Sequence, residues 1–229
     1  RNIRSILFPA VANRDQLREV IRLGEEMIPP LREIDEFSFL KMVEVEALDR
    51  QILVEKHLIS PRHTENPQNK GVILGEHDEI SIMVNEEDHF RIQVLQPGLQ
   101  LDAAWDLADR VDDCFEKKLD YAFNPEIGFL TACPTNVGTA LRASVMFHLP
   151  ALKRVKQVDK VLGTVSKFGL AVRGLYGEGS DVWGNIYQLS NQVTLGHSEE
   201  ETIEYLTRFT EQILHSERQA REYLMRSEE

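Results

Sequence analysis

The stretch that decides the fold spans residues 71–95 and reads GVILGEHDEISIMVNEEDHFRIQVL. It contains three candidate strands, at Gly71–Gly75, Glu79–Val84 and His89–Leu95. Apolar and polar residues alternate in the last two, as in a strand with one buried face. Because only the polar turn Asn85–Asp88 separates these two strands, we expect them to be neighbours in an antiparallel sheet.

Helical patterns lie on either side of this stretch. Apolar residues at helical spacing follow Asn13, which forms a capping box with Gln16, and Pro29-Pro30 is the predicted end of that helix. A second helix, from Leu101 to near Leu119, is expected to cover one face of the sheet. A third is expected from Ser198, capped by Glu201, to about Met225.

The remaining segments give a mixed pattern of elements. We predict a strand at Phe37–Val43, a helix at Val45–Leu58, an exposed loop at Ser60–Lys70, strands near Ile127–Cys133, Phe168–Val172 and Asn185–Asn191, and helices near Thr139–His148 and Ala151–Ser166. Helices and strands alternate irregularly, which indicates the α+β class with a mainly antiparallel sheet flanked by helices. No linker divides the sequence, so we expect residues 1–229 to form a single domain.

Composition narrows the classes of function. The chain has 229 residues, 42% of them hydrophobic, and a formal net charge of −12, with 26 Lys plus Arg against 38 Asp plus Glu. This charge disfavours nucleic acid as a direct ligand. No apolar run approaches the roughly 20 residues that a membrane helix needs. The two cysteines, Cys114 and Cys133, are too few for a disulfide framework, which favours a reducing compartment and a cytoplasmic location.

Familiar catalytic motifs are absent from the sequence. It contains neither G-x-x-x-x-G-K-[ST] nor G-x-G-x-x-G, and neither H-E-x-x-H nor G-x-S-x-G. The seven histidines are scattered, and no two of them share a helical face near a cysteine. The sequence therefore predicts no metal-binding residues.

Three segments nevertheless concentrate reactive side chains. The first is Asn85–Arg91, with three acids between two apolar strands, where Arg91 follows His89 on the same strand face. It is either a solvated turn or a carboxylate site at the rim of the sheet. The second is TACPTNVGT at residues 131–139, in which Cys133 ends a strand before a turn that opens a helix. Nearby amides would favour a thiolate there, although a buried cysteine, as expected for Cys114, is the plainer interpretation.

The third segment is rich in glycine. Residues 163–184 hold six of the thirteen glycines, and their centre reads RGLYGEGS at 173–180. Such density suits a loop that moves or approaches a ligand closely, and a plain surface loop is the alternative.

Together, NEEDHFRI, CPTNVGTALRASV and RGLYGEGS, in this order and preceded by EKHLIS, resemble the catalytic domain of the phosphagen (guanidino) kinases. Within that superfamily, LVEKHLISP, RGLYGEGS and SNQVTLG are similar to the bacterial protein-arginine kinases. The resemblance implies a guanido kinase catalytic domain of the glutamine-synthetase type. Such a domain transfers the γ-phosphoryl group of ATP to a guanidinium nitrogen, with Mg²⁺ held mainly through the nucleotide phosphates.

The resemblance also implies roles for individual residues. Glu87 and Glu178 would grip the guanidinium, and Cys133 would lie beside it. The residues implied to contact the nucleotide are His57, Arg91, Arg142, Ala143, Ser144, Val145, Met146, Arg173, Gly174, Leu175, Tyr176, Gly177 and Glu178. Arginine forks suit phosphate oxygens, and a guanidinium, whose pKa lies above about 12, needs carboxylates that orient it and accept its proton.

The resulting hypothesis is a kinase for arginine side chains of proteins, acting in bacterial stress response and protein quality control. The resemblance implies as partners proteins with exposed arginines, an activator protein, a stress-gene repressor, a Clp-type protease and a second copy of the chain in a homodimer. It also implies that residues are missing before Arg1 and after Glu229. The alternatives are a small-molecule guanidino kinase and a non-catalytic nucleotide-binding module.

Overall fold

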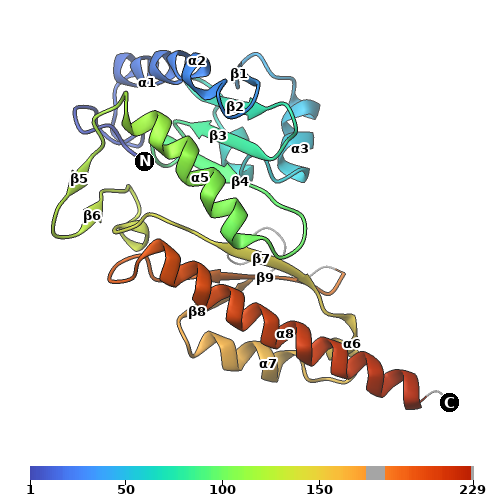
Figure 1. Ribbon diagram of the computed structural model, residues 1–229. Coiled ribbons are helices and arrows are strands. Elements are labelled where there is room, and N and C mark those ends of the chain that lie inside the picture. Colours follow the sequence, from blue (N-terminus) through green and yellow to red (C-terminus); the bar gives the residue numbers. More distant parts are fainter. Residues whose placement is uncertain (174–183, 228–229) are drawn as a thin grey trace. The chain divides into compact units, whose positions relative to one another are not determined.

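The computed structural model describes residues 1–173 and 184–227 (Figure 1). The chain forms two compact units, Arg1–Ala140 and Leu141–Glu229. The α+β class with antiparallel sheets flanked by helices is confirmed in both units. That the whole chain acts as one domain stays a prediction.

The first unit is built on a four-stranded antiparallel sheet in the order β1-β2-β3-β4. The strands are β1 (Phe37–Lys41), β2 (Gly71–Gly75), β3 (Ile80–Val84) and β4 (Phe90–Val94). The predicted pairing of the last two is confirmed, with Ile82 opposite Ile92 and Val84 opposite Phe90. Every residue of β3, one of the two central strands, is buried.

Helices cover both faces of this sheet (Figure 1). Helices α1 (Arg14–Glu26), α2 (Ile28–Leu31) and α5 (Leu101–Glu116) pack on one face. Their core contains Val20, Leu31, Ile73, Ile82, Val84, Phe90, Val111 and Phe115. On the other face, Leu53 and Val54 of α3 (Ala47–Glu55) pack against a smaller core of Met42, Ile59, Val72 and Met83.

Three predictions in this unit need correction. Helix α1 has the predicted capping box but ends at Glu26, before the prolines, which lie in the first turn of α2 where proline is tolerated. The expected loop at Ser60–Lys70 begins with the one-turn helix α4 (Pro61–Thr64), capped by Ser60. The strand expected near Ile127–Cys133 is reduced to β6 (Gly128–Phe129), which pairs with β5 (Phe123–Asn124).

The second unit contains a three-stranded antiparallel sheet in the order β7-β9-β8. The strands are β7 (Ser144–His148), β8 (Leu170–Arg173) and β9 (Ile186–Asn191). The helix predicted over Thr139–His148 is wrong, because Ser144–His148 pairs along β9 and places Phe147 inward between exposed Met146 and His148. That alternation is the period of a strand.

Three helices accompany this sheet. The helix predicted over Ala151–Ser166 is divided into α6 (Pro150–Arg154) and α7 (Val158–Ser166), because Lys156 between them has a positive φ of 58°. Helix α8 (Glu199–Ser227) starts with the predicted capping box, in which the main-chain N–H groups of Ser198 and Glu201 each donate to the other's side chain, at 3.0 and 3.1 Å. No helix within residues 1–173 and 184–227 is long and apolar enough to cross a bilayer.

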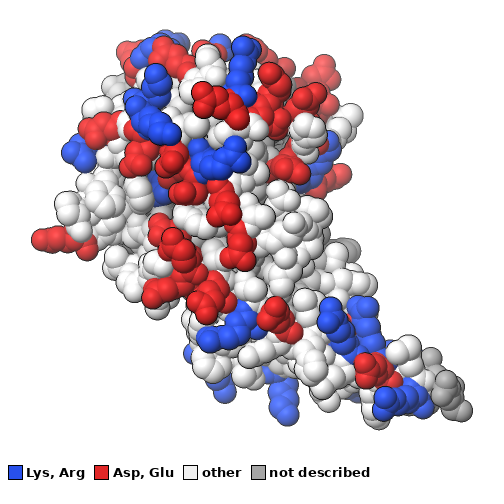
Figure 2. Space-filling model, in the orientation of Figure 1, with Lys and Arg blue, Asp and Glu red and all other residues white. Residues whose placement is uncertain are grey.

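Figure 2 shows that acidic and basic side chains are interspersed over the face in view. Helix α1 illustrates the mixture, because Arg22 forms ion pairs with Glu19 and Glu26 one turn away on either side. These pairs are exposed to solvent and therefore contribute little to stability. The surface charge therefore does not explain the fold, which depends on the two buried faces of the first sheet.

Gly128 offers a test of how the loop after β6 is held. Its φ is +85°, and a Cβ there would lie 2.5 Å from the carbonyl oxygen of Gly138. Gly128→Ala should therefore lower the free energy of unfolding by about 2 kcal/mol or more, through backbone strain and the displaced Phe129–Gly138 pairing. Gly98→Ala is the control, with φ +71° and no atom within 4 Å, and should cost about 1 kcal/mol. Equal losses in urea unfolding would contradict this account.

Candidate active site

The acidic turn between β3 and β4 is held at both ends. The main-chain N–H of Asn85 donates to the carbonyl of His89 at 2.9 Å. The buried Asn85 side chain donates to the carbonyls of Leu17 and Asn69, at 2.9 and 2.8 Å, and its φ is +59°. Asparagine tolerates this left-handed conformation better than most residues. The turn therefore presents the half-buried Glu87 from a fixed backbone.

Glu86 links this turn to Ser60 and Arg91. Its carboxylate accepts a hydrogen bond from the Ser60 hydroxyl at 2.7 Å and lies 3.7 Å from the Arg91 guanidinium. Burial raises the pKa of the Glu86 carboxyl, but the Ser60 hydrogen bond, the Arg91 charge and the Glu87 N–H together hold this pKa below its ordinary value. Glu86 therefore stays charged and anchors Arg91, whose side chain is 51% exposed.

His63 is the buried neighbour of this network. Its main-chain N–H donates to the Ser60 hydroxyl at 3.1 Å, and its Nε2 donates to the carbonyl of Gly71 at 2.9 Å. Its Nδ1 has no hydrogen-bond partner among the described residues. Burial lowers the pKa of His63 to about 4, so the ring is neutral at physiological pH.

Cys133 does not end a strand as predicted, because β6 ends at Phe129, and it immediately precedes a short helix instead. That helix is the 3₁₀ turn Pro134–Asn136, and Cys133 is its N-cap residue. The sulfur lies 3.0 Å from the Thr135 hydroxyl, and the Thr131 hydroxyl donates to the Cys133 carbonyl at 2.7 Å. Mutual hydrogen bonds between the Phe129 and Gly138 main chains close the loop around it.

The structure brings the acidic turn and the cysteine loop together. The Asp88 carboxylate, next to Glu87, accepts the main-chain N–H of Ala132, next to Cys133, at 2.7 Å. His57, at the end of α3, has a positive φ of 59°, and its carbonyl accepts a hydrogen bond from the Gln93 side chain of β4. All of these residues belong to the first unit.

The second unit holds the other predicted nucleotide residues. Arg142 donates through Nη1 to the carbonyl of Asn191 at 2.6 Å. The Asn191 side chain accepts the Ala143 N–H at 2.9 Å and donates to the Leu141 and Val193 carbonyls, both at 3.0 Å. The strand that follows, β7, carries Ser144 and Met146 on its exposed side and Val145 half-buried.

Of the RGLYGEGS stretch at 173–180, the structure describes only the first residue. The main chain of Arg173 ends β8 and pairs with Gln188 of β9. Gly174, Leu175, Tyr176, Gly177 and Glu178 lie outside the described residues.

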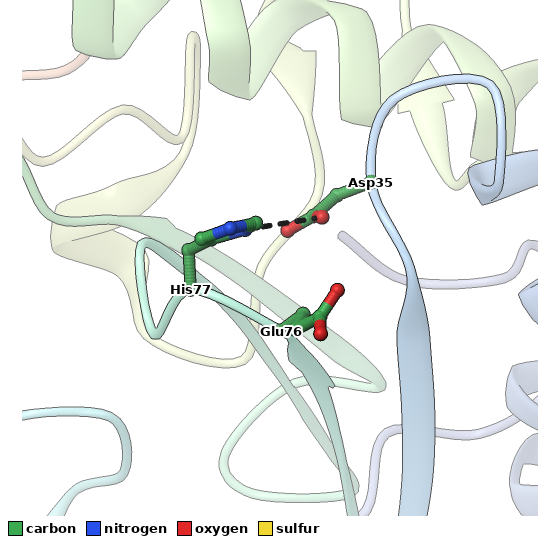
Figure 3. Close-up of side chains that lie close together, drawn as sticks. All are labelled: Asp35, Glu76 and His77. Carbon is green, nitrogen blue, oxygen red and sulfur yellow. Dashed lines mark ion pairs between the residues drawn. The ribbon is translucent and has the colours of Figure 1, made fainter.

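One cluster of possible metal ligands has no counterpart in the sequence analysis (Figure 3). Asp35, Glu76 and His77 lie together beside the paired ends of β1 and β2, with ligand atoms within 4.8 Å of one another. His77 Nδ1 lies 3.4 Å from the Asp35 carboxylate. Sequence spacing could not reveal this group, because only the pairing of Phe37 with Gly75 brings its members together. Exposed acidic groups often gather without a metal, so the cluster is described here as an ion pair with a neighbouring acid.

Comparison with known proteins decides the family. The model of the ATP:guanido phosphotransferase C-terminal catalytic domain matches residues 19–220. The chain belongs to this family. The match extends over parts of both units.

Curated relatives of the chain are bacterial protein-arginine kinases. The chain is 51% identical over 229 residues to the protein-arginine kinase of Halothermothrix orenii, and 50% identical over 230 residues to that of Caldanaerobacter subterraneus subsp. tengcongensis. Both alignments cover all of this chain. The chain spans 65% and 68% of the length of these relatives.

Solved structures support the same fold at lower identity. Lombricine kinase gives a TM-score of 0.78 at 25% identity, over 95% of this chain and 64% of that one. The duplicated taurocyamine kinase of Schistosoma mansoni with bound transition state analog components gives 0.86 at 24% identity, over 95% of this chain and 32% of that one. The predicted guanido kinase fold is therefore confirmed.

Because His63 is buried, the free energy of unfolding should depend on pH. The unfolded chain binds a proton at this ring below about pH 6.5, whereas the folded chain does so only near pH 4. Stability should therefore fall as pH falls from 6.5 towards 4, by at most about 1.4 kcal/mol per pH unit from this residue. His89, whose pKa burial also lowers, contributes with the same sign.

The measurement is urea unfolding between pH 7 and pH 5. His63→Gln should flatten the slope of stability against pH, whatever its effect at pH 7. His77→Gln is the control, because that side chain is 71% exposed, and it should leave the slope unchanged. An unchanged slope in His63→Gln would show that other groups cause the dependence.

Proposed function

We propose that this chain is the catalytic part of a protein-arginine kinase, which transfers the γ-phosphoryl group of ATP to arginine side chains of proteins. The observation that carries the proposal is about 50% identity, over the whole chain, to proteins named as protein-arginine kinases. The guanido phosphotransferase family match supports the same reaction class. Because the chain spans only part of those relatives, the activity is a proposal for the protein that contains it.

The arginines present fit a nucleotide polyphosphate. Arg91 and Arg142 both have exposed side chains, and they lie beside the Glu86 carboxylate and the Asn191 carbonyl, respectively. Planar guanidinium forks of this kind bind phosphate oxygens in pairs. We assign nucleotide contacts to these two residues, to His57, to Ala143–Met146 and to the segment Arg173–Glu178.

The acceptor guanidinium needs carboxylates. Glu87 on its fixed turn and Glu178 would orient the guanidinium and accept the proton that it loses as its nitrogen attacks the γ-phosphorus. The bond from that phosphorus to the bridging oxygen breaks, and the electron pair leaves with the nucleoside diphosphate. ATP is the donor of the phosphoryl group, and Mg²⁺ bound with it would offset the negative charge of the phosphate oxygens. Cys133 would position the guanidinium from the side.

The biological setting follows from the same resemblance. We infer bacterial stress response and protein quality control, with arginine-bearing proteins as substrates. An activator protein, a stress-gene repressor, a Clp-type protease and a homodimer are the partners that this setting suggests. A cytoplasmic location rests on the use of only two cysteines, both free in the described structure.

Carboxylate replacement tests the chemistry. Glu87→Gln and Glu178→Gln should each lower turnover by about 100-fold or more, because each removes a charge that orients or deprotonates the guanidinium. Cys133→Ser should be milder, since the thiol is assigned to positioning. The product is measured by mass spectrometry under neutral conditions that preserve acid-labile P–N bonds. Normal turnover in either Gln variant would remove that carboxylate from the mechanism.

The acceptor class needs a separate test, because lombricine kinase and taurocyamine kinase share this fold. The full-length protein is given an unstructured arginine-containing protein together with millimolar free arginine, and phosphate incorporation into each is measured. We expect the protein to be phosphorylated preferentially. A free amino acid would also need partners for its α-amino and α-carboxyl groups. Preference for free arginine would favour a small-molecule guanidino kinase instead.

A further inference from the structure

A single carboxylate oxygen joins the two segments to which acceptor binding is assigned. Oδ1 of Asp88 accepts hydrogen bonds from the Asn2 side-chain amide at 2.6 Å and from the Ala132 main-chain N–H at 2.7 Å. Asp88 directly follows Glu87, and Ala132 directly precedes Cys133. The hydrogen bond between Ala132 and Asp88 therefore sets the spacing between the acidic turn and the cysteine loop. Its two residues are the immediate neighbours of Cys133 and Glu87.

Asn2 completes this connection from a buried position, with 1% of its surface exposed. Its Oδ1 accepts the main-chain N–H of His89 at 2.9 Å, and its Nδ2 also donates to the Leu130 carbonyl at 3.0 Å. Its own carbonyl accepts the Ala122 N–H at 2.8 Å. Because both ends of the amide have partners, the orientation of the Asn2 side chain is fixed.

His89 holds the same N-terminal segment against the turn. Its Nδ1 accepts the main-chain N–H of Ile3 at 3.0 Å, so Nε2 carries the proton and donates to the Leu7 carbonyl at 2.9 Å. Burial lowers the pKa of His89 and keeps this neutral tautomer. The N-terminal residues are thus an integral part of the turn that presents Glu87.

We propose that Asp88, held by Asn2, is a positioning residue for guanidinium phosphorylation, because it sets the spacing between Glu87 and Cys133. The kinetic part of this inference rests on the proposed function. Asp88 acts here through the geometry of Oδ1, and its charge takes no part. A displacement of about 1 Å at reacting groups is enough to lower turnover by about 100-fold.

Three substitutions separate geometry from charge. Asp88→Asn keeps an oxygen at the Oδ1 position and loses the charge, whereas Asp88→Glu keeps the charge and moves the oxygen by one methylene. Asp88→Ala removes the acceptor altogether. For the full-length protein we expect Asp88→Asn to keep kcat within about threefold of wild type, and Asp88→Glu and Asp88→Ala to lower it by about 30- to 100-fold. The KM for ATP should stay within about twofold in all three, because the nucleotide residues are not displaced.

Thiol reactivity provides a readout that does not depend on kinase activity. In a Cys114→Ser background, the alkylation rate of Cys133 by iodoacetamide should match wild type in Asp88→Asn. It should change by about threefold or more in Asp88→Glu and Asp88→Ala, because the loop that holds the thiol is released. Asp35→Ala is the matched control. It removes the carboxylate that accepts the Glu36 N–H and pairs with His77 elsewhere in the same unit, and it should change neither kcat nor the alkylation rate.

The outcomes distinguish this inference from the proposed function. A wild-type protein that phosphorylates no guanidino acceptor refutes the proposed function, while the order of the alkylation rates still tests the Asp88 connection. An active wild type with Asp88→Glu faster than Asp88→Asn would overturn the positioning role in favour of charge. Asp88→Ala with wild-type kcat and alkylation rate would overturn it entirely. If Asp88→Ala does not fold, as judged by circular dichroism, the comparison of Asp88→Asn with Asp88→Glu decides alone.

Discussion

The register between β3 and β4 is the constraint on which the first unit depends. Every residue of β3 is buried, and its side chains alternate between the large core under α1 and α5 and the smaller core under α3. A slip by one position would turn each of these side chains towards the other core. The pairing of Val84 with Phe90 leaves only five residues for the connection between the strands. A polar turn of that length, with acids at three successive positions, has little freedom to place Glu87 elsewhere.

Three of the charged groups around this turn, Glu86, Asp88 and Arg91, each have a defined partner. Glu86 is almost buried and stays ionised through Ser60 and Arg91, and His63 beside it is kept neutral by burial. A second cation at His63 would compete with Arg91 for the same carboxylate. In the other unit, the Arg142 guanidinium donates to the neutral main-chain carbonyl of Asn191. Burial and charge interactions therefore act together on the side chains around the turn, keeping Glu86 charged and His63 neutral.

The sequence was informative wherever the determining contacts are local. Strands β2 to β4 and the two capping boxes depend on neighbouring residues, and they could be predicted from periodicity and spacing. Strand β7 could not, because its pairing of Ser144 with Ser190 is non-local and its short apolar run fits a helix equally well. The break between α6 and α7 depends on the positive φ of Lys156, which no sequence pattern predicts.

The candidate site likewise contains residues that sequence motifs could indicate and contacts that they could not. Motifs contiguous in sequence pointed to Glu87, Arg91 and Cys133, whose neighbourhoods the structure describes. The connection of Asn2 to Asp88 spans 86 positions and joins two ordinary polar residues, so neither composition nor periodicity could suggest it. The same holds for Asp35 and His77, which meet only through the β1–β2 pairing.

A site built in this way is held by hydrogen bonds within the protein. The hydrogen bonds that relate Glu87 to Cys133 run through buried Asn2 and half-buried Asp88, and groups of the protein itself supply both partners in each of them. Groups that need no rearrangement during phosphoryl transfer stabilise developing charge at the lowest cost in reorganisation. If Glu87 binds the acceptor as proposed, it does so from a turn that the first sheet already holds in place.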